Sequence, residues 1–396
     1  MRVKGVCGAL ALIMALSMPV STNASNVKGA SISEIITNPN TTVETTQVTD
    51  LSNLKVDKKS ITYYNNTNAV VYADDDAGKA VFTFSGVEDI FDDVNVDVDV
   101  SYTGGNSVKL EYDGTGNALT FSTQSKYYGK NAGKQKIQVK FTNSDNETKT
   151  FSLKVFAYNL RQRTDSNVLL AKDKTKTVKL ERQKSTNGSW RGIKAEKVTW
   201  KTSNKNVAKI SNKGKITAKK KSKTCYVTGE YENYTYYWSV NVTTADKVKV
   251  IKTAKNIYAT SKYSQPLRMR QGYYDCSSLV WRSYRLIGKY LGTSSRATYA
   301  PTAAGIAQYL EGKGKTISGG ISKSNTDNGK LIAGDLLFEG GASNGRYRGV
   351  YHVEMFTGYD ISYIKSNGKP VYMNSWASKP DGRYGYGTSN DFVCRP

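Results

Sequence analysis

The run Val-Thr-Trp-Lys-Thr-Ser-Asn-Lys-Asn-Val-Ala-Lys-Ile-Ser-Asn-Lys-Gly-Lys-Ile-Thr-Ala (198–218) decides the fold class of the middle of the chain. Val198 and Trp200 alternate with polar residues, and turns rich in Asn, Lys and Gly separate short apolar stretches. Alternation with a period of two predicts strands that bury one face. We therefore predict a β-module over residues 159–246, with Cys225 alternating into its core as a small apolar residue.

The preceding segment shows the same alternation. Val94, Val96, Val98 and Val100 alternate with polar residues, and so do the apolar positions of 137–141 and 151–155. Gly, Asn and Asp turns lie between these stretches, which predicts an antiparallel β-sandwich module over residues 53–158. Residues 25–52 are rich in Ser, Thr and Asn without a period, and we expect them to form a flexible leader.

The N-terminus predicts export. Arg2 and Lys4 precede an apolar run from Ala9 to Val20, and Ala24 offers a cleavage position. This pattern is typical of a signal peptide over residues 1–24. The run is shorter than the roughly 20 residues that span a bilayer, so we expect a secreted protein at the cell wall or in the medium, without a membrane span. Removal of Cys7 leaves three cysteines, an odd number that flags a reactive thiol.

The positive charge is concentrated in one segment. The chain has a formal net charge of +24, and residues 161–260 hold 24 Lys and Arg against 7 Asp and Glu, a net charge of +17. Such a face can bind anionic polymers, and for an exported protein we expect anionic wall polymers rather than nucleic acid. The alternative is a lysine-rich surface that only keeps the module soluble.

Three motifs that suit thiol chemistry lie in residues 257–396. Asp275 is a good N-cap, and apolar residues from Leu279 to Leu291 recur at helical spacing, so Cys276 is expected in the first turn of a helix. There the helix dipole favours thiolate over thiol. His352, the only histidine of the chain, suits the role of general base, and Asn374 suits an amide that orients its ring.

Two resemblances follow from these motifs. The run 198–218 resembles the bacterial immunoglobulin-like domains of surface proteins. The motifs Tyr-Asp-Cys-Ser-Ser-Leu-Val (274–280), Ala-Gly-Asp-Leu-Leu-Phe (333–338), His-Val-Glu-Met-Phe-Thr-Gly (352–358) and Tyr-Met-Asn-Ser-Trp-Ala-Ser (372–378) resemble, in order, the NlpC-type family of cell-wall cysteine peptidases. This second resemblance covers residues 257–396 and implies an α+β papain-like catalytic domain, so that the predicted fold is multidomain, with all-β immunoglobulin-like sandwich modules followed by that domain.

The NlpC-type resemblance also implies an activity and its residues. It implies hydrolysis of peptide bonds in peptidoglycan stem peptides, typically between D-glutamate and a diamino acid. By position, Cys276 matches the nucleophile, His352 the base and Asn374 the third polar residue. Asp275 and Ser277 match positions that bind the free amine of the substrate.

Three departures from the family pattern bear on the site. Leu267 stands where a tyrosine often assists the oxyanion, so Tyr263 or Tyr273 is a candidate substitute. Ser278 replaces a glycine. Glu354 replaces a small residue on the strand face of His352, where we expect it to border the substrate site and to favour imidazolium. The alternative is that Glu354 turns away into solvent or forms an ion pair with an arginine such as Arg346 or Arg348.

No metal or other cofactor is expected. A chain with one histidine and no Cys-x-x-Cys cannot build the usual zinc sites. Asp74, Asp75 and Asp76, with the pair Asp97 and Asp99, suggest calcium, but the ligand spacing of an EF-hand is absent.

Three functions remain open from the sequence. The leading one is a secreted peptidoglycan endopeptidase whose β-modules hold it at the wall. The second keeps the thiol mechanism but cuts the amide bond between glycan and stem peptide. The third is a surface binding protein whose last domain has no activity.

Overall fold

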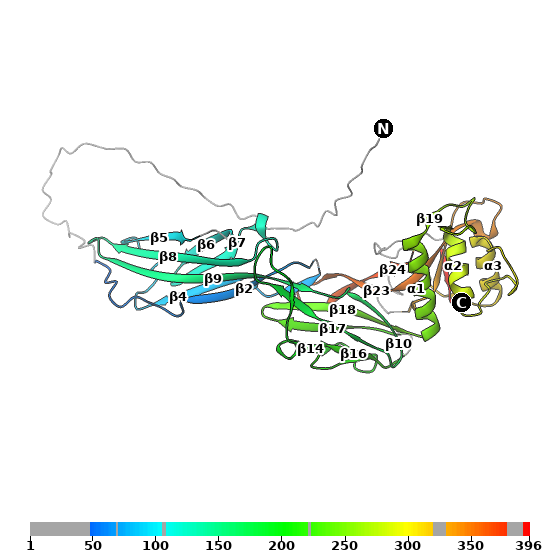
Figure 1. Ribbon diagram of the computed structural model, residues 1–396, viewed down its shortest axis with the longest axis horizontal. Helices are drawn as coiled ribbons and strands as arrows, with labels where there is room; N and C mark the ends of the chain where they lie inside the picture. The colour runs from blue at the N-terminus through cyan, green and yellow to red at the C-terminus, as the bar shows by residue number, and fades with distance from the viewer. Residues whose placement is uncertain (1–47, 69, 105–107, 221–222, 320–329, 378–390) are drawn as a thin grey trace, which may run out of the picture. The chain divides into compact units, whose positions relative to one another are not determined.

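The computed structural model describes residues 48–68, 70–104, 108–220, 223–319, 330–377 and 391–396 (Figure 1). The predicted signal peptide, 1–24, and most of the predicted leader lie outside the described residues. Val48–Pro396 forms one compact unit.

The first part of this unit consists of two sheets that share a core. The four-stranded sheet has the order β1 (Lys55–Val56), β4 (Lys79–Ser85), β7 (Ala118–Thr123) and β6 (Leu110–Thr115). The six-stranded sheet has the order β13 (Arg191–Gly192), β12 (Leu180–Gln183), β9 (Thr148–Gln162), β8 (Gly133–Asn143) and β5 (Val96–Thr103), with β2 (Ser60–Asn66) parallel to β9. Phe82 and Phe121 from one sheet and Val139 and Phe141 from the other are fully buried in the common core.

The alternation in the sequence sets which side chains enter this core. On β8, Ile137, Val139 and Phe141 are buried, whereas Gln138 and Lys140 are exposed. Val94 departs from the pattern, because it precedes β5 and is 96% exposed.

The second part also consists of two sheets around a core. One has the order β10 (Asn167–Ala171), β18 (Tyr234–Thr243), β17 (Lys223–Tyr231) and β14 (Thr199–Thr202), and β3 (Val71–Ala73) pairs with β18. The other has the order β11 (Thr175–Thr177), β16 (Lys215–Ala218) and β15 (Ala208–Ile210). Trp238 and Val227 from the first sheet and Ile216 from the second are fully buried between them.

The turn at Gly214 packs tightly against this second core. Gly214 has a φ of +69°, and a Cβ there would lie 2.6 Å from the carbonyl oxygen of Val178 and 3.0 Å from the ring of Trp200. The turn between β15 and β16 therefore needs a residue without a side chain.

The last part combines helices with a sheet. The helices are α1 (Ala245–Thr260), α2 (Cys276–Arg285) and α3 (Ala303–Gly312). The five-stranded antiparallel sheet has the order β21 (Thr316–Ile317), β25 (Phe392–Cys394), β22 (Leu336–Gly340), β23 (Val350–Ile364) and β24 (Pro370–Trp376). A two-stranded sheet joins β19 (Lys262–Tyr263) to β20 (Tyr273–Tyr274), and the single-turn 3-10 helices are η1 (Ser125–Tyr127), η2 (Ala195–Lys197) and η3 (Tyr347–Gly349).

This sheet has apolar residues on both faces. Phe338, Val353 and Met355 pack with the helices in one cluster, and Phe356 and Trp376 belong to a second cluster. The sheet also bonds to the preceding β-part, because Ser239 Oγ and Asn241 Nδ2 on β18 donate to the carbonyl oxygen of Tyr359 over 2.6 and 2.8 Å.

The predicted α+β papain-like catalytic domain is wrong. Of the described residues, 45% lie in strands and 14% in helices, and three α-helices are present among them. The helical spacing that extends to Leu291 misled the prediction, because α2 ends at Arg285, and Gly288 and Leu291 have φ values of +73° and +47°. Many of the remaining apolar residues of 257–396 that the structure describes lie in strands, among them Val353, Met355 and Phe356 of β23.

Candidate functional site

Cys276 is the first residue of α2. The carboxylate of Asp275 accepts a hydrogen bond from the Ser278 amide over 2.7 Å, and Ser278 Oγ accepts one from the Asp275 amide over 2.8 Å. This reciprocal capping box fixes where the helix begins. The predicted location of Cys276 in the first helical turn is confirmed, and its side chain lies at the positive end of the helix dipole, with only 6% of the residue exposed.

Arg268 holds the two residues that flank Cys276. One guanidinium nitrogen donates to Asp275 over 3.1 Å and to Ser277 over 2.8 Å, and the other donates to the carbonyl oxygen of Ala300. The side chains of Arg268 and Asp275 are 10% and 7% exposed. Asp275 and Ser277 are therefore tied into a buried network, and the sequence reasoning missed its organising residue, Arg268. The sequence held one indication of this role: Arg268 lies next to Leu267, where the chain departs from the NlpC-type pattern.

His352 and Glu354 meet on one face of β23. Nε2 of His352 lies 3.4 Å from Oε1 of Glu354, whose side chain is fully buried. Burial alone lowers the pKa of His352, but the neighbouring Cys276 and the hydrogen-bonded Glu354 outweigh it and raise the pKa to about 10. The imidazolium form is therefore favoured beside Cys276.

Arg348, one of the two arginines suggested as ion-pair partners of Glu354, makes other contacts. Arg348 donates to Glu311 over 2.8 Å, and its guanidinium lies 4.1 Å from the ring centre of Phe392. Strand alternation thus placed Glu354 correctly beside His352.

Tyr263 is the aromatic neighbour of the thiol. Burial and the nearby Cys276 raise the pKa of Tyr263. Tyr263 packs edge to face on Tyr274 at 5.6 Å between ring centres. Of the two tyrosines that the sequence suggested as substitutes for Leu267, Tyr263 therefore lies beside Cys276. Leu267 itself is 37% exposed.

The third predicted residue is described only in part. Asn374 belongs to β24, where its backbone pairs with Tyr359. Its side chain lies outside the described residues, so its predicted role toward His352 stays a prediction.

A pocket of about 190 Å³ opens at Cys276. Its lining comprises two arginines, two hydroxyl residues of the helix starts and a tyrosine, together with the thiol: Gln265, Arg268, Asp275, Cys276, Ser277, Thr302, Ala303, Ala304, Arg346 and Tyr351. The pocket is polar, and since Arg268 is paired with Asp275, Arg346 is the cation of its lining that suits a carboxylate on a substrate.

One group of side chains in the described part can hold a metal ion. Ligand atoms of Glu339, His352 and Glu354 lie within 4.8 Å of one another. A histidine and two carboxylates suit a divalent transition metal. Such an ion would compete with Cys276 for His352, so the metal site and the thiol site exclude each other.

Two other cysteines of the described residues are free and buried. Burial raises the pKa of Cys225 and of Cys394 to about 11 in each case. The prediction that Cys225 is a small core residue is confirmed, because it is 3% exposed in the core of the second β-part. Neither thiol is set up as a nucleophile.

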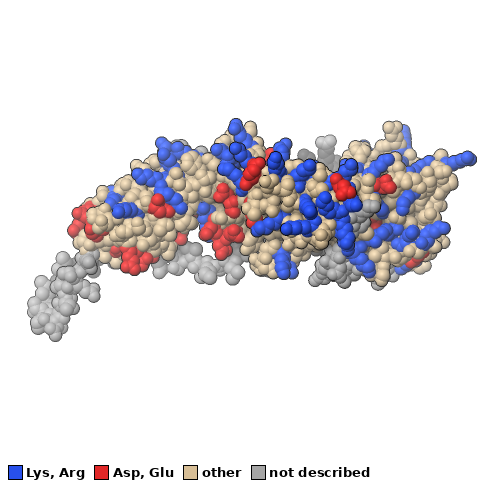
Figure 2. All heavy atoms as spheres, turned by 90° about the horizontal axis from the view of Figure 1, so that it is seen from below, with Lys and Arg blue, Asp and Glu red and all other residues tan. Residues whose placement is uncertain are grey.

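Basic side chains are spread widely over the molecular surface. Figure 2 shows Lys and Arg along the whole face in view and most densely over its middle and right, while most of the Asp and Glu lie in its left half. The segment 161–260, with its net charge of +17, supplies much of this excess.

Comparison with known proteins finds no matching family model and no matching curated protein. Among solved structures, a C-terminal fragment of intimin in complex with an intimin-binding domain is 12% identical, with 88% of this chain and 99% of that chain covered and a TM-score of 0.27. Invasin, a bacterial integrin-binding protein, is 10% identical over 47% of this chain and 37% of its own, with a TM-score of 0.25. Domains 4 and 5 of the S-layer protein SbsC are 18% identical over 50% of this chain and 100% of that one, with a TM-score of 0.18.

The NlpC-type resemblance stays a prediction from the motifs. Within the described residues, no helix is both long and apolar enough to cross a membrane.

Proposed function

We propose that the protein is a secreted hydrolase that cleaves amide bonds with Cys276 as nucleophile and His352 as acid and base. The observation that carries the proposal is the placement of the chain's only histidine, whose pKa the neighbouring Cys276 helps to raise, beside a cysteine in the first turn of a helix. A thiolate and an imidazolium in contact form the pair that thiol hydrolases use.

The chemistry needs two steps. Sγ of Cys276 attacks the carbonyl carbon of the substrate amide, and the C–N bond breaks as His352 gives its proton to the leaving amine. Water then attacks the thioester, His352 takes up a proton from that water, and the thiolate leaves. Backbone amides at the start of α2 and the hydroxyl of Tyr263 are suited to stabilise the oxyanion of both steps.

The proposed substrate is the stem peptide of peptidoglycan. The motifs around Cys276 and His352 resemble those of cell-wall peptidases, and the predicted signal peptide directs the chain out of the cell. Arg346 on the pocket wall suits a peptide with a free carboxylate, as D-glutamate provides, whereas Arg268 is already paired with Asp275. Cleavage between glycan and stem peptide is the variant of this proposal with the same residues and another bond.

The test is digestion of purified sacculi with the full chain. We expect soluble stem-peptide fragments, whose masses identify the cleaved bond, and their loss in Cys276→Ala with an unchanged thermal melt. Cys225→Ala is the matched control, since it removes a buried thiol outside the pocket and should leave most activity. Cleavage by folded Cys276→Ala would overturn the proposal.

A second candidate is a surface binding protein without catalysis. The basic segment 161–260 favours this function, since it can hold anionic wall polymers whatever the state of the thiol. Wall binding by a parent protein that never releases fragments would support this candidate against the hydrolase.

A further inference from the structure

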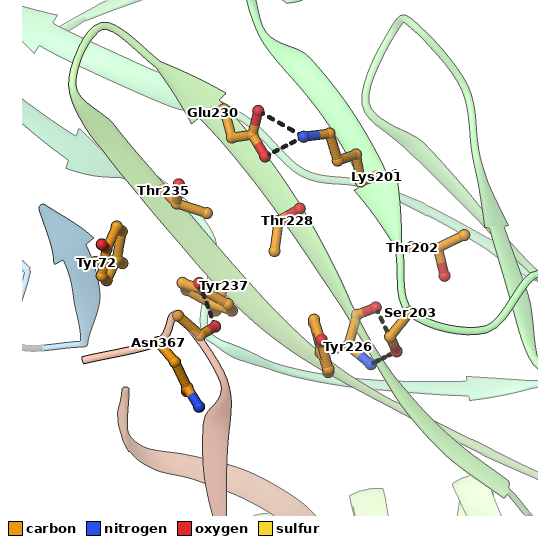
Figure 3. A pocket seen from close by; sticks show the side chains of 11 residues that line it. Tyr72, Lys201, Thr202, Ser203, Tyr226, Thr228, Glu230, Thr235, Tyr237 and Asn367 are labelled. Carbon is orange, nitrogen blue, oxygen red and sulfur yellow. Dashed lines mark hydrogen bonds and ion pairs between the residues drawn. The ribbon is translucent and has the colours of Figure 1, made fainter. Parts of the chain in front are cut away.

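A second pocket, of about 480 Å³, lies on the β-part of the unit, away from Cys276. Its floor is one face of the sheet that contains β3, β14, β17 and β18, and Figure 3 shows its side chains. The turn between β23 and β24 forms one wall (Figure 3). The lining is Tyr72, Lys201, Thr202, Ser203, Tyr226, Thr228, Glu230, Thr235, Tyr237, Asn367 and Gly368.

Strand register explains why these side chains meet. Thr235 pairs with Tyr72 on one side and with Glu230 on the other, and Thr228 pairs with both Tyr237 and Lys201. Residues that face each other across neighbouring strands point to the same side of a sheet. The opposite face carries Val227 and Trp238, which lie in the core, so the sheet presents tyrosines and hydroxyls on one side and apolar residues on the other.

The wall of the pocket is fixed to its floor. The hydroxyl of Tyr237 donates to the carbonyl oxygen of Gly368 over 2.8 Å, and the ring of Tyr237 lies 6.0 Å from that of Tyr226 between centres. Burial raises the pKa of Tyr237 to about 12, so this hydroxyl remains a donor at neutral pH. The aromatic floor and the turn are therefore held in place without a ligand.

The charges of the lining residues indicate which class of ligand the second pocket can bind. Among the described lining residues, the ionised ones are Lys201 and Glu230, which pair at 2.7 and 2.9 Å and cancel. The pocket is thus neutral within a segment whose net charge is +17. An anionic ligand gains nothing from the neutral pair, whereas a neutral polar ligand can bond to both its members.

We propose that this pocket binds a neutral carbohydrate chain. A sugar ring presents a C–H face, which packs on the negative face of a tyrosine ring, and an edge of hydroxyls, which matches side chains that donate and accept. Tyr72 and Tyr226, which are half-buried, offer the rings, and Thr228, Glu230 and Asn367 offer the polar partners, while the buried Tyr237 supports Tyr226 and the turn. The site goes beyond the proposed hydrolysis and does not depend on Cys276.

The test uses the full chain and a β-1,4-linked tetrasaccharide of N-acetylglucosamine, followed by calorimetry. We expect saturable binding that Tyr72→Ala and Tyr226→Ala each weaken about tenfold, near the upper limit for one aromatic contact. Tyr226→Phe keeps the ring and should bind like the parent. Tyr112→Ala is the matched control, because Tyr112 is a tyrosine of β6 with 49% exposure outside the pocket.

Two further arms make the result decisive. Cys276→Ala should bind the tetrasaccharide unchanged, so that failure of the hydrolase proposal leaves this one standing. Polyphosphate binding should be insensitive to the two tyrosine replacements. Absence of tetrasaccharide binding to the parent, equal binding by folded Tyr72→Ala and Tyr226→Ala, or loss of polyphosphate binding in these variants would each overturn the carbohydrate site.

Discussion

Nε2 of His352 lies 3.4 Å from Oε1 of Glu354, a carboxylate with no exposed surface, on the face of β23 that meets Cys276. Two residues apart on one strand, they share a face because side chains alternate. A buried carboxylate beside an imidazole stabilises its protonated form. Cys276 and Glu354 together therefore favour the protonated state of the only histidine in the chain and raise its pKa.

The titration of His352 is the first prediction. With a single histidine, the imidazole resonance needs no assignment, and we expect its pKa near 10, well above the ordinary value of 6.5. Glu354→Gln keeps the size of the side chain and removes its charge, so it should lower the pKa of His352. Nuclear magnetic resonance titration of parent and variant measures the shift, and a parent value at or below 6.5 would contradict the arrangement.

Stability and activity should follow the same titration. Because the folded pKa of His352 is raised above its unfolded value, its contribution to stability is complete below about pH 6.5 and is lost as pH rises toward 10.

The upper limb of the pH–rate profile of hydrolysis should move to lower pH in Glu354→Gln, with turnover retained. Complete inactivation of folded Glu354→Gln would instead make the carboxylate essential.

Local pattern was enough to predict much of the β-structure and the relation between His352 and Glu354. Alternation identifies which residues of β8 are buried, and the N-cap at Asp275 identifies where α2 begins. Both features depend on near neighbours in the sequence, which is why they can be predicted from it.

Contacts between residues far apart in the chain could not be predicted from the sequence. The spacing of Ile287 and Leu291 suits a helix, yet the backbone of Gly288 and Leu291 takes positive φ values and ends it. The bonds from Ser239 and Asn241 to Tyr359 join residues more than 100 positions apart. No local pattern of the sequence predicts such pairs, nor the bond from Tyr237 to Gly368 that joins the wall of the second pocket to its floor.

The effect of metal ions distinguishes thiol hydrolysis at Cys276 and His352 from metal binding by Glu339, His352 and Glu354. The proposed thiol chemistry needs no metal, so treatment with a chelator should leave hydrolysis unchanged. Zinc should inhibit, since Glu339, His352 and Glu354 can bind it and withdraw the imidazole from Cys276. Assays with chelator and with added zinc check both expectations, and Glu339→Gln should weaken inhibition. Activity that a chelator abolishes and zinc restores would contradict the thiol mechanism.

Wall binding should depend on salt. The segment 161–260 has a net charge of +17, and the Debye length falls from about 10 Å at 0.1 M salt to about 3 Å at 1 M. We expect retention of the full chain on sacculi to weaken across this range. Sedimentation with sacculi measures it, and retention that is insensitive to salt would place the attachment elsewhere, with the carbohydrate pocket as one candidate.

The last prediction concerns Arg268, which positions the start of α2. Its guanidinium bonds to Asp275, Ser277 and the carbonyl oxygen of Ala300, and the ion pair with Asp275 is almost fully buried. Arg268→Met keeps the aliphatic stem but leaves a buried carboxylate without its cation. Removal of one partner from a buried pair costs about 3–5 kcal/mol, so the thermal melt should fall clearly.

A matched comparison separates this role from a general loss of charge. Arg161→Met also breaks a hydrogen-bonded ion pair, with Glu181 at 2.9 Å, but Arg161 is 39% exposed, and a second arginine, Arg163, also contacts Glu181. This variant should therefore melt close to the parent. Arg268→Lys restores the charge without the forked geometry and should recover only part of the stability. Equal melting of Arg268→Met and parent would show that Asp275 does not need its cation to cap α2.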